Sequence, residues 1–318
     1  MVTFLDLIQA QRHIRPWVQP SPLEHSRRLS QLLGASVHLK LENFRELRSF
    51  KVRGAVNFMV SRLPECRRYG VVAASGGSHA LGVAFAAAHL DVQATIVMTE
   101  RAPANLQNIV ASYGAQVEVC GQVYDDASTR AKEIARESGA RIIDSFNDPH
   151  IIAGQGTIAL EIFAELPETD MIICPVGGGG LLAGVALGAK TISPACQIIG
   201  VEPEQANAMH RSLAAGQLVE VDNPVSIADK LVTRRTGDLA FATAQPHTDA
   251  VYCVTEEQIR QAVRQLLAEA SLLAEGAGAA PLALLLSEQV DIRDKQVVLV
   301  VTGGNIDSAV LQKILQES

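Results

Sequence analysis

The stretch MIICPVGGGGLLAGVALGAK, residues 171–190, gives the clearest fold signal in the sequence. Its first six residues are apolar, which is typical of a strand buried on both faces of a parallel sheet. Four consecutive glycines follow, and the alanine- and leucine-rich segment from Leu181 to Lys190 favours a helix. This stretch therefore predicts a strand, a glycine loop and a helix in succession.

Two further junctions of this kind occur elsewhere in the chain. Val71–Ala74 is predicted to be a strand, and a loop at Ser75–Ser78 separates it from an alanine-rich helix. Gln296–Val301 is predicted to be a strand that ends at Thr302-Gly303-Gly304. Apolar strands that alternate with helices indicate the α/β class, with parallel sheets covered by helices on both faces. Ligands of such sheets bind beyond the carboxyl ends of the strands, where all three loops are expected.

The composition excludes several classes of protein. Of the 318 residues, 48% are hydrophobic and 19% are charged, which excludes intrinsic disorder. The formal net charge of -7 offers no basic footprint for nucleic acid. No apolar run reaches the roughly 18 residues of a membrane span, and no secretory signal is visible at the N-terminus. We therefore expect a small-molecule partner, and neither nucleic acid nor a membrane.

The cysteines indicate a reduced protein. Five cysteines are widely spaced, no two form a C-x-x-C pair, and their number is odd: Cys66, Cys120, Cys174, Cys196 and Cys253. A zinc site and a disulfide framework are both poor interpretations of this pattern. We expect a cytoplasmic protein without a structural metal.

The glycine loop has two chemical interpretations. Glycines bring bare N–H groups close to an anion, and a helix N-terminus adds partial positive charge, so the loop suits a phosphate group. The spacing Gly178-x-Gly180-x-x-x-Gly184 also approaches the dinucleotide fingerprint G-x-G-x-x-G, with one residue too many. Glu202 follows near the place of a ribose-binding acid. On this loop alone, an NAD-dependent oxidoreductase remains an alternative.

A second stretch, LKLENFRELRSFKVRGA at residues 39–55, resembles the lysine-bearing segment of a known family. That family is the fold-type-II pyridoxal-phosphate enzymes, which are tryptophan synthase β-like, and specifically their threonine/serine dehydratase and serine racemase group. The resemblance implies that Lys51 holds the cofactor as a Schiff base and then removes the α-proton of the substrate. Phe50 would pin the cofactor ring and exclude water.

Other segments resemble the family in the same order along the chain. They are ASGGSH at 74–79, IIAGQGT at 151–157, PVGGGGL at 175–181, SIAD at 226–229, EGAG at 275–278 and VTGGN at 301–305. The resemblance implies a loop for the substrate carboxylate made of Ser75, Gly76, Gly77, Ser78 and His79. It implies further cofactor contacts from Ser78, Gly177, Gly178, Gly179, Gly180, Leu181, Glu275 and Thr302.

The family resemblance also implies an activity. The expected enzyme is an ammonia-lyase of amino-acid metabolism, a threonine or serine dehydratase that converts L-threonine or L-serine to a 2-oxo acid and ammonia. A neutral hydroxyl such as Thr302 at the ring nitrogen would leave that nitrogen largely unprotonated, which favours elimination. Racemisation, β-replacement and dehydration of 3-hydroxyaspartate remain alternatives. The family is usually dimeric, so a homodimer is expected.

The implied architecture has two open, mostly parallel sheets. Residues 64–146 would form a small mobile domain, and residues 1–63 with 147–318 the larger domain that binds pyridoxal phosphate. The sequence ends soon after the Thr302 loop, so we expect no C-terminal regulatory domain.

Four positions depart from the family pattern. Ser78 replaces an asparagine that contacts the cofactor, and Gly76 replaces the serine that acts as proton donor in racemases, so racemisation should be poor. Lys230 replaces the glycine of an Ala-Asp-Gly segment. This cation either favours a side-chain anion, as in 3-hydroxyaspartate, or points into solvent. Glu202 matches one carboxylate of the racemases' metal site, but Ala208 occupies the place of the second, so we expect no metal.

Overall fold

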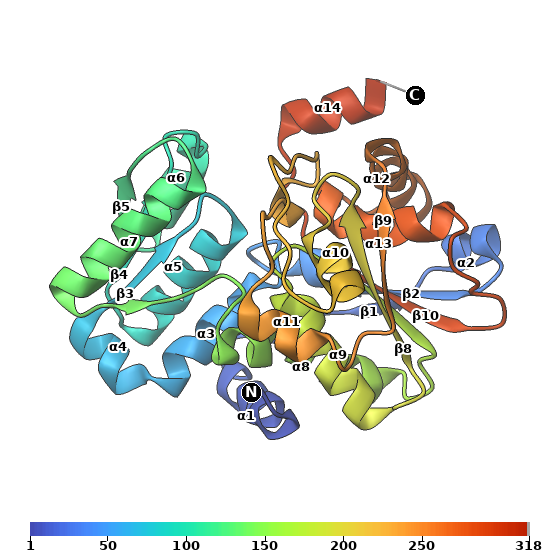
Figure 1. Ribbon diagram of the computed structural model, residues 1–318, viewed down its shortest axis with the longest axis horizontal. Helices are drawn as coiled ribbons and strands as arrows, with labels where there is room; N and C mark the ends of the chain where they lie inside the picture. Colours follow the sequence, from blue (N-terminus) through green and yellow to red (C-terminus); the bar gives the residue numbers. More distant parts are fainter. Residues whose placement is uncertain (317–318) are drawn as a thin grey trace. The chain divides into compact units, whose positions relative to one another are not determined.

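The computed structural model describes residues 1–316, which form two compact units (Figure 1). The larger unit consists of Met1, Pro20–Phe50 and the chain from Gly156 onward. The smaller unit consists of Val2–Gln19 and Lys51–Gln155, so it includes all of residues 64–146. The mobility of that segment stays a prediction.

The larger unit is built on a six-stranded sheet. Its strands, in spatial order, are β1 (Leu23–His25), β2 (Ser36–Leu41), β10 (Gln296–Val301), β7 (Met171–Pro175), β8 (Gln197–Pro203) and β9 (Ala250–Val254). Only the edge pair of β1 with β2 is antiparallel among these strands. The predicted parallel sheet is confirmed by the parallel pairing of β10 with β2 and β7, and of β7 with β8. Strands β10 and β7 lie at its centre and are almost entirely apolar and buried.

Helices cover both faces of this sheet. On one face, α2 (Arg27–Leu33), α12 (Glu256–Ala270) and α13 (Gly276–Leu286) share an apolar core with the strands. Elsewhere α9 (Gly180–Ile192) contacts β7 and β8, and α11 (Asp238–Ala244) packs on α9. The remaining elements are η1 (Glu42–Phe44), α10 (Ala208–Ala215), η2 (Asp229–Leu231) and α14 (Ser308–Gln316).

The smaller unit contains a four-stranded parallel sheet. Its order is β5 (Gln116–Val119), β4 (Ala94–Met98), β3 (Val71–Ala74) and β6 (Arg141–Ile142). The helices of this unit are α1 (Phe4–Ile14), α3 (Lys51–Ser61), α4 (Leu63–Tyr69), α5 (Ser78–Leu90), α6 (Ala104–Ser112) and α7 (Tyr124–Ser138). Two buried alanines of α7, Ala127 and Ala131, pack against Val72 and Val97 of the sheet. Helix α8 (Pro149–Glu165) belongs to both units, because the boundary between them lies at Gln155–Gly156.

Local signals explain where several helices begin. The spacing Thr255-x-x-Gln258 predicts a capping box before α12, and the structure confirms it: the Thr255 hydroxyl accepts the N–H of Gln258 at 3.2 Å, and the Gln258 amide oxygen accepts the N–H of Thr255 at 2.8 Å. The helical patterns of Tyr124–Ser138 and Pro149–Glu165, the latter with a proline in its first turn, predict α7 and α8, which begin at these residues. Within residues 1–316, no helix combines the length and apolar character needed to cross a membrane.

Candidate active site

Lys51 is the first residue of α3 and is half-buried. Its ammonium donates a hydrogen bond to the carbonyl oxygen of Ser145 at 2.8 Å. Helix α5 lies directly against this end of α3, because a Cβ added to Gly82 would come within 3.1 Å of the Lys51 carbonyl carbon. Gly82 therefore permits a close approach between the beginning of α5 and Lys51, the residue predicted to hold the cofactor.

The predicted carboxylate loop lies at the carboxyl end of β3. Ser75 donates its N–H to the Val97 carbonyl oxygen at 3.0 Å, and its hydroxyl accepts the N–H of Gly77 at 3.2 Å. These bonds hold the turn, and α5 then begins at Ser78. The first N–H groups of a helix have no acceptor within it, so this loop presents donors that suit a carboxylate.

His79 is buried beside this loop, where it is 3% exposed. Its Nε2 donates to the carbonyl oxygen of Ile143 at 3.1 Å, which leaves Nδ1 as the unprotonated nitrogen, without a hydrogen-bond partner in residues 1–316. Burial, reinforced by the positive charge of Lys51, lowers the pKa of His79 to about 4. The imidazole is therefore neutral near pH 7. This supports a role for His79 in positioning the loop, and it argues against a role as a positively charged group that binds the substrate carboxylate.

The glycine loop of the larger unit joins β7 to α9. Gly179 has φ of 91°, and a Cβ at this position would lie 2.8 Å from the Met209 side chain, so other residues are strained there. The first backbone bond of α9 runs from the N–H of Ala183 to the Gly179 carbonyl oxygen at 2.9 Å. The N–H groups of Gly180 and Leu181 precede that bond and have no acceptor within the helix, which is the donor set that a phosphate needs.

Backbone hydrogen bonds connect three segments of the larger unit, which contain Phe50, Thr302 and Glu275. Phe50 donates its N–H to the Thr302 carbonyl oxygen at 3.3 Å, beside an antiparallel bridge between Ser49 and Gly303. Glu275 donates its N–H to the Gly303 carbonyl oxygen at 3.0 Å. Three of the residues predicted to contact the cofactor therefore lie together in the larger unit. Thr302 and Glu275 are buried, at 3% and 4% exposure.

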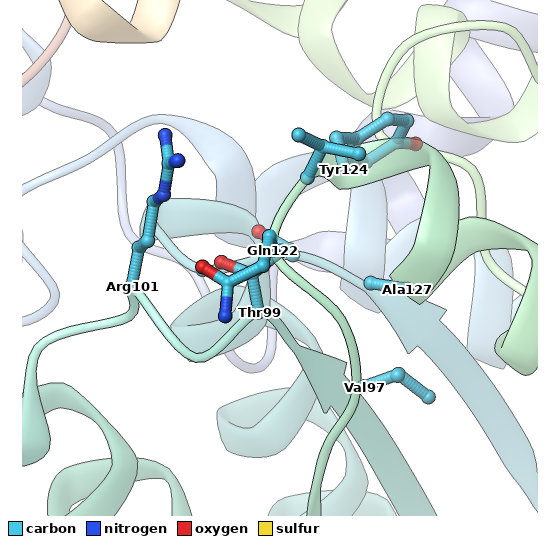
Figure 2. A pocket seen from close by; sticks show the side chains of 9 residues that line it. Val97, Thr99, Arg101, Gln122, Tyr124 and Ala127 are labelled. Carbon is cyan, nitrogen blue, oxygen red and sulfur yellow. The ribbon is translucent and has the colours of Figure 1, made fainter.

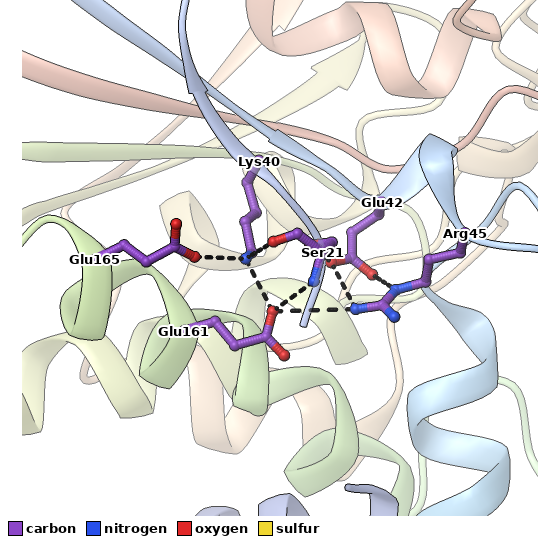
Figure 3. A network of polar contacts seen from close by, with 6 residues as sticks. All are labelled: Ser21, Lys40, Glu42, Arg45, Glu161 and Glu165. Atoms are coloured by element: carbon purple, nitrogen blue, oxygen red, sulfur yellow. Dashed lines mark hydrogen bonds and ion pairs between the residues drawn. The ribbon is translucent and has the colours of Figure 1, made fainter. Parts of the chain in front are cut away.

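A buried ionic network anchors the segment that leads to Lys51 (Figure 3). The Lys40 ammonium is fully buried and lies 2.8 Å from a Glu161 carboxylate oxygen. Arg45 pairs with Glu42 at 2.5 Å, and Glu161 lies at 4.0 Å from the same guanidinium. The Ser21 hydroxyl adds a hydrogen bond to Glu42 at 2.5 Å. The network ties β2 and η1 to α8, so it fixes where residues 42–50 leave the sheet.

Lys230 lies in η2, close to the glycine loop through its backbone. Its carbonyl oxygen would lie 3.1 Å from a Cβ added to Gly177. Its ammonium, however, lies 2.5 Å from a carboxylate oxygen of Asp229, so its charge is already compensated by a neighbour.

Glu202 has a structural partner that the sequence did not indicate. It is fully buried, and its two carboxylate oxygens accept the N–H groups of Met209 at 2.9 Å and His210 at 2.7 Å. These N–H groups belong to the first turn of α10, so Glu202 caps that helix. Burial raises the pKa of Glu202 to about 8. No group of three or more potential metal-binding side chains occurs among the residues that the structure describes.

A pocket in the smaller unit includes residues that the sequence analysis did not select (Figure 2). Ser75 and Gly76 line it together with Thr99, Arg101 and Tyr124. Thr99 and Arg101 follow β4, and Tyr124 begins α7. The signal that could have found them is their position: each follows a strand of the same sheet at its carboxyl end.

Comparison with known proteins decides between the interpretations of the glycine loop. Residues 14–303 match the family model described as "Pyridoxal-phosphate dependent enzyme". The chain belongs to this family. Pyridoxal phosphate is therefore its cofactor, and the resemblance found in the sequence is confirmed. An NAD-dependent oxidoreductase is no longer supported, and Gly184 lies inside α9.

Individual relatives agree with the family. The chain is 40% identical over 317 residues to an L-threonine ammonia-lyase of Thermotoga maritima, covering 100% of this chain and 79% of that protein. Threonine deaminase isoform 2 of Solanum lycopersicum superimposes with a TM-score of 0.93 at 35% identity, covering 98% of this chain and 87% of that one. Maize serine racemase gives a TM-score of 0.93 at 32% identity, covering 99% and 97%. The fold-type-II α/β architecture is thus confirmed.

The residues present fit this cofactor. The N–H groups at the beginning of α9 suit its phosphate, the buried hydroxyl of Thr302 suits a neutral ring nitrogen, and the half-buried amine of Lys51 suits its aldehyde.

Proposed function

We propose that the protein is a pyridoxal-phosphate-dependent ammonia-lyase that dehydrates L-threonine or L-serine to a 2-oxo acid and ammonia. The observation that carries the proposal is the similarity to an L-threonine ammonia-lyase over the whole of this chain and 79% of that protein, together with a lysine at the beginning of α3 in the family's lysine-bearing segment. When bound, the cofactor supplies an electron sink for the α-carbon of the amino acid.

The residues of the smaller unit would handle the substrate. Backbone N–H groups at the point where the Ser75–Ser78 loop enters α5 would bind its carboxylate, and His79, neutral at pH 7, holds that loop against the Ile143 carbonyl. Lys51 would hold the cofactor through its side-chain amine and, once released from it, would remove the α-proton of the substrate. The bond from Cβ to the hydroxyl then breaks, and the hydroxyl leaves as water. Hydrolysis of the enamine product gives the 2-oxo acid and ammonia.

The residues of the larger unit would hold the cofactor. The loop Gly177–Gly180 and Leu181 donate N–H groups to its phosphate. Phe50 would lie against its ring, the Thr302 hydroxyl would meet the ring nitrogen, and Glu275 would complete the contacts that this unit offers. A neutral partner such as the Thr302 hydroxyl would leave the ring nitrogen largely unprotonated, which would favour elimination over reactions that need a long-lived carbanion.

The proposal extends to the state of the protein. The five cysteines are all free, which suits a reducing, cytoplasmic environment. We also propose a homodimer, which sedimentation of the purified protein would test.

A substrate panel tests the proposed reaction. The purified protein should be yellow and should release 2-oxo acid from L-threonine and L-serine. Lys51→Ala should lose at least about 10³-fold in kcat/KM, because it removes both the attachment and the base. D-serine should form from L-serine far more slowly than pyruvate does, since Gly76 replaces the racemases' serine. Rapid D-serine formation with little 2-oxo acid would favour serine racemase, and a protein without 2-oxo acid release would contradict the proposal.

A further inference from the structure

The pocket shown in Figure 2 has a volume of about 330 Å³. It lies at the carboxyl ends of β3 and β4, beside the first turn of α7, entirely within the smaller unit. Figure 2 shows Arg101 and Tyr124 on opposite sides, with Gln122 and Thr99 between them. Pockets of roughly this size accept small ligands.

The pocket adjoins the place where the substrate carboxylate would bind. Ser75 and Gly76 line it, and both belong to the proposed carboxylate loop. A substrate whose α-carboxylate is held by that loop would place its side chain near the pocket. The side chain of threonine, with one methyl and one hydroxyl group, would leave most of the volume to water.

Arg101 is the one charged side chain that lines the pocket. In the described part of the chain, no hydrogen bond or ion pair to its guanidinium is found. The neighbouring acids are already engaged: Glu100 accepts a hydrogen bond from the Gln122 amide, and Asp126 accepts the backbone N–H groups of Gln122 at 2.9 Å and Val123 at 3.2 Å. Arg101 is exposed to solvent and has no acidic partner within residues 1–316, so its guanidinium offers a fork of donors that match a carboxylate.

Lys230, the other cation that could bind an anionic substrate side chain, is less suitable than Arg101. The Lys230 ammonium lies 2.5 Å from the Asp229 carboxylate, and that ion pair would have to break before Lys230 could bind a substrate anion. Arg101 needs no such exchange.

We infer that this pocket receives a second carboxylate, carried on the side chain of the substrate, and that Arg101 selects for it. This inference rests on the proposed elimination and gives it a substrate class: β-hydroxy amino acids with an acidic side chain, of which 3-hydroxyaspartate is the simplest. The α-proton moves to Lys51, the β-hydroxyl leaves as water, and hydrolysis gives oxaloacetate and ammonia, so atoms balance without an oxidant or reductant.

The test compares kcat/KM for 3-hydroxyaspartate and L-threonine in wild type, Arg101→Gln and Arg101→Lys. Wild type should prefer 3-hydroxyaspartate by at least about 10-fold. Arg101→Gln should lose about 10- to 100-fold toward 3-hydroxyaspartate and less than about 3-fold toward threonine, because only the dicarboxylic substrate forms the charged hydrogen bond. Arg101→Lys should recover part of the loss. Arg136→Gln, an exposed arginine on α7 outside the pocket, is the matched control.

Binding gives a readout that does not depend on turnover. Succinate should raise the melting temperature of the wild-type holoenzyme more than butyrate of the same chain length, and Arg101→Gln should remove the difference. Turnover of threonine but not of 3-hydroxyaspartate would overturn this inference and leave the proposed function standing, as would equal losses for both substrates in Arg101→Gln. Failure to release 2-oxo acid from either substrate would overturn both.

Discussion

His79 shows how burial assigns a role to a single residue. A histidine in a predicted substrate loop suggests an acid or base, yet its Nε2 is committed to the Ile143 carbonyl and its pKa is lowered to about 4. Because the folded-state pKa lies below the unfolded value of about 6.5, the neutral histidine contributes stability that is fully present above that value. This contribution is lost as the pH falls toward 4.

The replacement His79→Asn tests this linkage. Between pH 7 and pH 5, the free energy of unfolding of the wild-type holoenzyme should fall by up to about 2 kcal/mol more than that of His79→Asn. Urea unfolding at the two pH values measures the difference. The same pH dependence in wild type and His79→Asn would show that His79 does not titrate as its burial requires.

At the scale of elements, the sequence predicts helix boundaries that depend on local signals, but it does not predict boundaries that depend on contacts with distant residues. Helices α7 and α8 and strand β10 have the bounds that their sequence patterns predict. The sequence also predicts a final helix over Asn305–Leu315, but α14 begins at Ser308 instead. The Asn305 amide donates to the Leu47 carbonyl oxygen, 258 positions away, at 2.9 Å, and the Gly304 N–H donates to the Arg48 carbonyl oxygen at 3.0 Å, so contacts with a distant segment hold these residues out of the helix.

The ionic network of β2, η1 and α8 is an element-scale feature with a sharp test. Glu161→Gln would leave the fully buried Lys40 ammonium without its partner at 2.8 Å. We expect a loss of about 3–5 kcal/mol in the free energy of unfolding, the usual result when one member of a buried pair is removed.

Glu165→Gln is the matched control. Glu165 lies on the same helix and faces the same ammonium, but at 3.8 Å and with 48% of its side chain exposed. Its removal should cost less than about 1 kcal/mol. Urea unfolding of both variants measures the two losses, and equal losses would contradict the assignment of Glu161 as the principal partner of Lys40.

At the scale of the whole molecule, collinear segments predicted far more than periodicity did. The family, the cofactor and the α/β fold followed from short stretches around Lys51, the glycine loop and Thr302, and the comparisons confirm them. The pocket around Arg101 could not be predicted in this way. Its lining comes from loops after β3, β4 and β5 that are 20 or more residues apart in the chain, and only the folded sheet brings them together.

Reduction of the purified protein with borohydride tests the central claim most directly. Borohydride fixes a Schiff base as a stable amine, so the yellow colour should bleach and the cofactor should remain attached through denaturation and digestion. Mass spectrometry of the peptides should then find reduced pyridoxal phosphate on Lys51. A colourless protein, or a label that lies on another lysine such as Lys40 or Lys230, would contradict the account.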